Sequence, residues 1–134
     1  TRADLYRALL ESVGFGIRHN MDGMLAEGIV PKHILAVGGG AKNLAWMQTI
    51  SDIANIEMSI PEQQVGSAYG DAFLAGIGVG LFSGVHEVRK WVRYMRHITP
   101  NPESTARYTP LYGIYRELYE RTSSLMGKLS ALHR

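Results

Sequence analysis

Three consecutive glycines directly after a short apolar run constrain this chain more than any other feature of its sequence. Residues 34–37 (Ile-Leu-Ala-Val) are continuously apolar, which is typical of a strand buried on both faces. Glycines occupy positions 38–40, and apolar side chains then recur at helical spacing over residues 42–54. A strand, a glycine turn and a helix in this order predict an α/β unit, with the turn beyond the carboxyl end of the strand.

The flanking segments continue this alternation of helices and strands. Residues 57–60 (Glu-Met-Ser-Ile), closed by Pro61, predict a second short strand. Apolar spacings of three and four predict helices at residues 4–27, 66–81, 85–95 and 108–133, with a connector at 98–106. We therefore predict one α/β domain over residues 1–134, helix-rich and with a small parallel sheet. Because two strands make a poor sheet, we expect the other strands of this domain upstream of this sequence.

Small residues inside two of the predicted helices indicate close packing. Gly14 and Gly16 lie within the first helix, where glycine costs about 1 kcal/mol relative to alanine. We interpret both as points of close approach to a neighbouring element. The helix at 66–81 carries a stripe of small residues with the same expected role: Ala68, Ala72, Ala75, Gly76 and Val79.

Composition excludes several classes of protein. Hydrophobic residues make up 46% of the 134 residues, which is enough for a buried core. The absence of cysteine excludes disulfides, Cys-based zinc sites and a thiol nucleophile, and it suits a cytoplasmic location. A net charge of +2 is too small to indicate nucleic-acid binding, and no apolar run is long enough to span a membrane. The five histidines lack the spacing of metal ligands.

The glycine turn has the chemistry of an anion-binding site. The first N–H groups of a helix have no partner within the helix and lie at the positive end of its dipole. Missing β-carbons let a ligand approach the backbone, while Lys42 adds a cation and Asn43 a donor and an acceptor. The sequence matches neither the G-x-G-x-x-G fingerprint nor a Walker loop. The residues alone are compatible with a phosphate or nucleotide site and with a tight turn that binds nothing.

Residues 37–48, VGGGAKNLAWMQ, resemble the GGGAKS-x-x-W-x-Q segment of FGGY carbohydrate kinases. The Ser51–Ala54 segment is similar to the "ADv" that follows it in that family, and GSAYGDAFLAGIGVG is similar to a family helix rich in small residues. LYRALLESVGFGIRHNMDGM resembles the family's long helix, and PNPESTARYTPLYGIYRELY resembles the C-terminal segment of the xylulokinase type. The resemblance covers nearly the whole chain in the same order, and it identifies the chain as a C-terminal part of such a kinase.

This resemblance implies an actin-like fold of two ribonuclease-H-like domains, with ATP and Mg²⁺ in the cleft between them. Carried over to this sequence, it implies four residues in contact with the nucleotide: Gly39, Gly40, Ala41 and Asn43. Gly38 would shape the turn, and Lys42 would either reach the nucleotide or face solvent. The N-terminal domain of the same protein would supply the catalytic base, an aspartate, and most contacts to the sugar. No residue of this chain is therefore assigned a catalytic role, and we expect the chain alone to be inactive.

The implied reaction transfers the γ-phosphoryl group of ATP to a sugar hydroxyl, with a ketose such as xylulose as the expected substrate. One alternative is a non-catalytic actin-like module that binds ATP with the same turn. Another is a helical oligomerisation or nucleic-acid-binding module, built on the basic residues Arg89, Lys90 and Arg93 and on the last helix. That helix carries a 4-3 seam that could pair with a second copy as a homodimer: Leu111, Tyr115, Leu118, Thr122, Leu125, Leu129 and Leu132.

Overall fold

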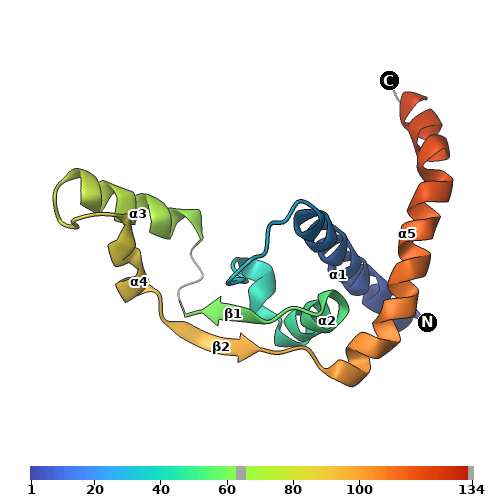
Figure 1. Ribbon diagram of the computed structural model, residues 1–134, viewed down its shortest axis with the longest axis horizontal. Helices are drawn as coiled ribbons and strands as arrows, with labels where there is room; N and C mark the ends of the chain where they lie inside the picture. The colour runs from blue at the N-terminus through green and yellow to red at the C-terminus, as the bar shows by residue number, and fades with distance from the viewer. Residues whose placement is uncertain (63–65, 133–134) are drawn as a thin grey trace.

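A small sheet connects two groups of helices in the computed structural model, which describes residues 1–62 and 66–132. The α-helices are α1 (Arg2–Ala26), α2 (Leu44–Ala54), α3 (Ser67–Gly78), α4 (Val88–Trp91) and α5 (Pro102–Ala131). The strands are β1 (Met58–Pro61) and β2 (Tyr94–Ile98), and two 3₁₀ helices span Gly39–Lys42 and Val85–Glu87. Helices α1, α2 and α5 lie toward one end of the sheet, and α3 with α4 lies toward the other (Figure 1).

The prediction of a parallel sheet is wrong, because the two strands that form are antiparallel. β1 pairs with β2 in a register that places Met58 opposite Ile98. Residues 34–37, predicted as a strand, contribute only one parallel bridge, between Leu35 and Ser59. Within the described ranges the sheet consists of β1 and β2, and residues 34–37 join it only through this isolated bridge.

Strand β2 falls where the sequence pattern predicted the end of a helix and a connector. The predicted helix at 85–95 ends at Trp91, and Val92 already has extended backbone angles. β2 then exposes most of its side chains, including the charged Arg96, and buries only Ile98. Because an edge strand of this kind lacks a clear apolar alternation, it was not recognisable from periodicity.

Helix α2 packs over the sheet and forms the main hydrophobic core. Buried side chains of this core come from the first 3₁₀ helix, α2 and both strands: Ala41, Met47, Ile50, Met58, Ile60 and Ile98. Along β1, Met58 and Ile60 are buried while Ser59 between them is half-buried, as expected of a strand with one covered face. The core therefore lies directly behind the glycine turn.

The close packing predicted for the first helix is confirmed at Gly14. A β-carbon at this position would lie only 2.7 Å from Cδ1 of Ile53, a fully buried residue of α2. The same prediction is wrong for Gly16, because no described atom lies within 4 Å of its β-carbon position. One glycine thus sets the distance between α1 and α2.

Aromatic and polar contacts join α1 to the first half of α5. Phe15 stacks on Tyr112, with ring centroids 6.3 Å apart. The Tyr112 hydroxyl donates to a carboxylate oxygen of Asp22 at 2.6 Å, and the Arg18 guanidinium lies 4.4 Å from the Tyr112 ring centre. Burial, followed by the hydrogen bond to Asp22, raises the pKa of Tyr112 to about 12. These contacts hold α5 against α1 while the Tyr112 hydroxyl keeps its proton.

We expect alkaline pH to weaken this docking through Tyr112. In the unfolded chain tyrosine loses its proton near pH 10, whereas the folded protein holds it until about pH 12. The folded state therefore binds more protons in this window, so stability falls as the pH rises from 10 to 12. Thermal unfolding across this range should show a smaller decline for Tyr112→Phe than for the unchanged protein. Equal declines would show that Tyr112 does not carry this pH dependence.

Helices α3 and α4 share a separate aromatic cluster. Phe73 stacks on Phe82 at 4.7 Å, and Trp91 meets Phe82 edge-on at the same distance. Gly76 makes room for Phe82, since a β-carbon there would lie 2.5 Å from its ring. The rest of the predicted small-residue stripe, including Ala72 and Ala75, is exposed. The stripe is therefore packed at one position only among the described residues.

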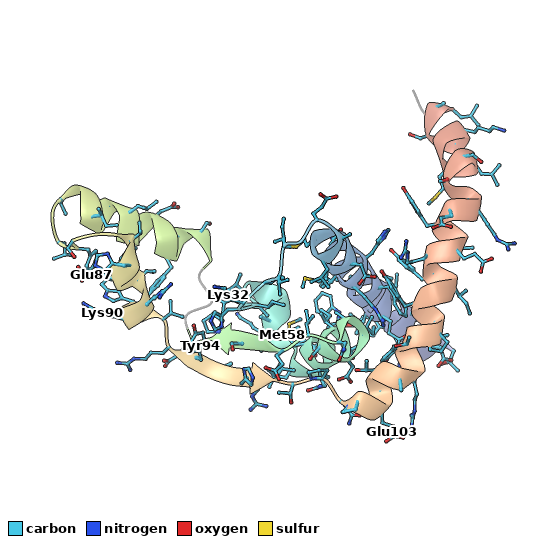
Figure 2. The ribbon with its side chains drawn as sticks, in the orientation of Figure 1. Lys32, Met58, Glu87, Lys90, Tyr94 and Glu103 are labelled. Carbon is cyan, nitrogen blue, oxygen red and sulfur yellow. The ribbon has the colours of Figure 1, made fainter. Side chains whose placement is uncertain are left out.

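The features behind the alternative functions lie on exposed surfaces. Lys90 forms an ion pair with Glu87 at 3.7 Å, and Figure 2 shows both residues beside α4. Trp91 packs in the aromatic cluster described above. The final helix begins at Pro102, six residues before the predicted start, with Asn101 as its N-cap. Its second half projects away from the other helices, and the leucines of the predicted seam are exposed (Figure 1). None of the described helices is both long and apolar enough to cross a membrane.

Candidate functional site

The glycine turn is a short 3₁₀ helix entered through a residue with positive φ. Gly38 has φ of +90°, a conformation that side chains disfavour, so glycine is favoured at the entry to this turn. The Ala41 N–H donates to the Gly38 carbonyl at 3.2 Å, and the Asn43 N–H donates to the Gly40 carbonyl at 3.0 Å. Helix α2 follows directly at Leu44.

One side of the turn is open and the other is filled by the protein itself. At Gly38 and Gly39 no described atom lies within 4 Å of the β-carbon position. At Gly40 a β-carbon would lie 2.7 Å from Cζ3 of Trp46. Ala41 is only 2% exposed, because its methyl group lies in the core. The small size of Gly40 and Ala41 is thus required by internal packing, whereas that of Gly39 is not.

Two N–H groups of the turn have no acceptor among the described residues. Within residues 1–62 and 66–132, no backbone or side-chain oxygen accepts a hydrogen bond from the N–H of Gly39 or Gly40. Free N–H groups at the start of a helix bind anionic oxygens well. The backbone of these two residues is therefore the part of the turn best able to hold a phosphate or ribose oxygen.

The two polar residues of the turn have different surroundings. The side-chain oxygen of Asn43 accepts from the Trp46 N–H at 3.1 Å and so caps α2. This leaves its amide nitrogen as the group able to donate to a ligand. Lys42 is exposed at the end of the 3₁₀ helix. The predicted site residues therefore lie together, and Asn43 also stabilises the start of α2 as its N-cap.

A buried carboxylate holds the far end of α2, and sequence reasoning assigned it no role. Asp52 is 7% exposed, and its Oδ1 accepts from Gln48 Nε2 and from the Asn101 N–H, both at 2.8 Å. The Asp52 carbonyl also accepts from the Thr105 hydroxyl at 2.9 Å. Asp52 therefore ties α2 to the start of α5. The signal for it was its place in the family-like segment that follows the turn.

An apolar cavity of about 350 Å³ lies behind the turn, between α1, α2 and residues 34–37. It is lined mostly by aliphatic side chains, with Trp46 at one wall and Gly40 at its edge. Such a lining offers no polar groups to orient a charged ligand. The described ranges also contain no group of three or more His, Asp or Glu residues able to hold a metal ion. The polar chemistry of this region is confined to the turn.

Comparisons with known proteins agree with the sequence resemblance. The family model described as "FGGY family of carbohydrate kinases, C-terminal domain" matches residues 1–79. The chain is 36% identical over 126 residues to a xylulose kinase of Lactococcus lactis, covering 92% of this chain and 25% of that protein. The chain thus spans about a quarter of the length of the curated relatives that it matches.

Solved structures share the fold as well. A xylulose kinase from Rhodospirillum rubrum superposes with a TM-score of 0.77 at 32% identity, covering 93% of this chain and 25% of that one. A glycerol kinase from Plasmodium falciparum, solved with ADP, superposes with a TM-score of 0.68 at 26% identity, covering 87% and 23%. With its family segment, its order of elements and its fold in agreement, the chain belongs to the FGGY family of carbohydrate kinases, whose C-terminal domain it matches.

Proposed function

We propose that the protein carrying this chain is an ATP-dependent carbohydrate kinase, and that residues 1–134 form its C-terminal nucleotide-binding part. The observation that carries this proposal is the glycine turn itself: Gly39 faces open space, and the N–H groups of Gly39 and Gly40 have no acceptor within residues 1–62 and 66–132. The related glycerol kinase was solved with ADP, an adenine nucleotide, which supports the same ligand class here. The matched relatives include several xylulose kinases as well as autoinducer-2 kinases, and the xylulose kinases favour a ketose such as xylulose as the substrate.

In this function the turn binds and orients the nucleotide. The N–H groups of Gly39 and Gly40 donate to nucleotide oxygens, and the bare Gly39 backbone lets the ligand approach closely. Asn43 donates through its side-chain amide nitrogen while its oxygen caps α2. Holding ATP in one orientation lowers the barrier to phosphoryl transfer, because little covalent chemistry is needed from the protein. When bound, ATP supplies the phosphoryl group that passes to a sugar hydroxyl.

The residues of this chain fit ATP but do not by themselves fit Mg²⁺. The open turn offers hydrogen-bond donors to an anionic ligand, whereas the described residues include no acidic cluster for a metal ion. We therefore assign the metal ligands, the catalytic base and most sugar contacts to the N-terminal domain of the complete protein. The chain alone would then bind part of the nucleotide without turnover.

Gly39→Val in the complete kinase tests the site. The valine side chain would start from a β-carbon position that has no described protein atom within 4 Å, on the open side of the turn. We expect the KM for ATP to rise about tenfold, equivalent to about 1.4 kcal/mol, while the KM for the sugar stays within a factor of two. Steady-state kinetics with each substrate varied in turn provides the measurement.

The matched control is Gly113→Val, which places the same side chain in open space on α5. It should leave both KM values unchanged, because Gly113 lies outside the turn. If Gly39→Val left the KM for ATP unchanged in a folded protein, the turn could not be the nucleotide site.

A further inference from the structure

Trp46, in α2, contacts both α1 and the glycine turn. Its backbone N–H donates to the side-chain oxygen of Asn43 at 3.1 Å, which fixes the start of α2. Its indole N–H donates to the Leu10 carbonyl of α1 at 3.0 Å. Its ring lies against Gly40, close enough that a β-carbon there would be 2.7 Å from Cζ3. One residue of α2 therefore joins this helix to α1 and to the turn.

The turn needs such a support because its own sequence is flexible. Three consecutive glycines have more backbone freedom than any other residues, and ordering them costs conformational entropy. Two backbone hydrogen bonds, from the Ala41 and Asn43 N–H groups, stabilise the turn from within. A binding site also requires its donors to be held within about 0.5 Å of the productive geometry. A rigid indole against Gly40 restricts the backbone at the point where the free N–H groups lie.

We propose that Trp46 is the positioning residue of the nucleotide turn. The ring contact with Gly40 and the indole hydrogen bond to α1 hold the N–H groups of Gly39 and Gly40 in place for ATP. Trp46 itself covers the side of the turn toward which a β-carbon at Gly40 would point, so it acts through the backbone. This inference rests on the proposed function, since it assumes that the turn binds the nucleotide.

The packing of the helices does not depend on Trp46 alone. Helices α1 and α2 also meet where Ile53 packs against Gly14, and the Arg18 guanidinium donates to the Ile53 carbonyl at 3.0 Å. These contacts remain when Trp46 is shortened. A Trp46 variant should therefore keep the helix pair and lose the fixed geometry of the turn, which separates positioning from general stability.

Trp46→Phe in the complete kinase tests this inference, because phenylalanine lacks both the indole N–H and the ring edge that contains Cζ3. We expect the KM for ATP to rise about tenfold, with the KM for the sugar and the kcat at saturating ATP within a factor of two. The matched control is Trp91→Phe, the same substitution in the aromatic cluster of α3 and α4. It should leave the KM for ATP unchanged.

A double-mutant cycle with Gly40→Ala makes the test specific. The added methyl group meets Cζ3 of Trp46, so Gly40→Ala alone should also raise the KM for ATP about tenfold. In the Trp46→Phe background that atom is gone, and Gly40→Ala should add less than a factor of three. Independent effects, with a product near a hundredfold, would overturn the inference. An unchanged KM for ATP in Trp46→Phe, with only the thermal midpoint lowered, would overturn it as well.

Gly39→Val distinguishes the two proposals. If it weakens ATP binding while Trp46→Phe does not, the nucleotide turn stands and its support by Trp46 is wrong. If Gly39→Val has no effect on ATP binding, the proposed nucleotide site fails, and the role of Trp46 fails with it.

Discussion

Gly14→Leu will destabilise the protein by about 3 kcal/mol, the upper part of the range for overpacked cores. The new β-carbon would lie 2.7 Å from Cδ1 and 3.2 Å from Cβ of Ile53. Rotation of the Ile53 side chain could relieve the first contact, but its Cβ is fixed to the backbone of α2. Ile53 is also fully buried, so it has no free space to enter. Relief therefore requires α1 and α2 to move apart, which weakens the packing behind the glycine turn.

Gly23→Leu is the control for this prediction. Gly23 lies in the same helix, it is exposed, and no described atom lies within 4 Å of its β-carbon position. Leucine there improves helix propensity by up to about 1 kcal/mol without any clash. Calorimetric unfolding of the complete protein should show a lower midpoint temperature for Gly14→Leu than for the unchanged protein. The midpoint temperature of Gly23→Leu should not be lowered. Equal midpoints for the two variants would mean that α1 and α2 are not held together at Gly14.

The helices that surround the turn were predictable because local pattern decides them. The spacing of apolar residues located α1 and α2 to within a few residues at each end. The sheet was harder to predict from the sequence, because strand pairing depends on residues that are distant in the sequence. Residues 34–37 and β2 show this in opposite ways. The apolar run at 34–37 forms only one bridge, whereas the mostly exposed β2 finds a full partner in β1.

Sequence reasoning located the glycine turn but did not show that its residues have different surroundings and different roles. Three adjacent glycines look equivalent in a sequence, yet Gly39 faces open space and Gly40 faces the ring of Trp46. That difference arises from contacts with α1 and α2, so no local motif reveals it. The capping role of Asn43 was not predicted from the sequence either. Its side-chain oxygen accepts a hydrogen bond from the Trp46 N–H, which makes Asn43 the N-cap of α2. The role of each residue depends on which neighbour the fold brings to it.

Asp52→Ala will cost about 2 kcal/mol of stability, because it removes a buried acceptor that two donors share and leaves one of them without a described partner. Oδ1 of Asp52 is the oxygen that both Gln48 Nε2 and the Asn101 N–H contact at 2.8 Å. Gln48 can still donate to the Thr99 carbonyl at 2.9 Å, whereas no second acceptor is described for the Asn101 N–H. The expected consequence is a loosened start of α5, where Asn101 is the N-cap.

Asp52→Asn separates the lost acceptor from the lost charge. Asparagine keeps an oxygen where Oδ1 lies, so both donors retain their partner, and only the favourable charge near the start of α5 is removed. Its cost should therefore be below about 1 kcal/mol. Hydrogen–deuterium exchange at the Asn101 amide gives the residue-level readout, with fast exchange in Asp52→Ala and protection kept in Asp52→Asn. Equal protection in both variants would show that the carboxylate does not join α2 to α5, and the link would then depend on the Thr105 hydroxyl and the Asp52 carbonyl alone.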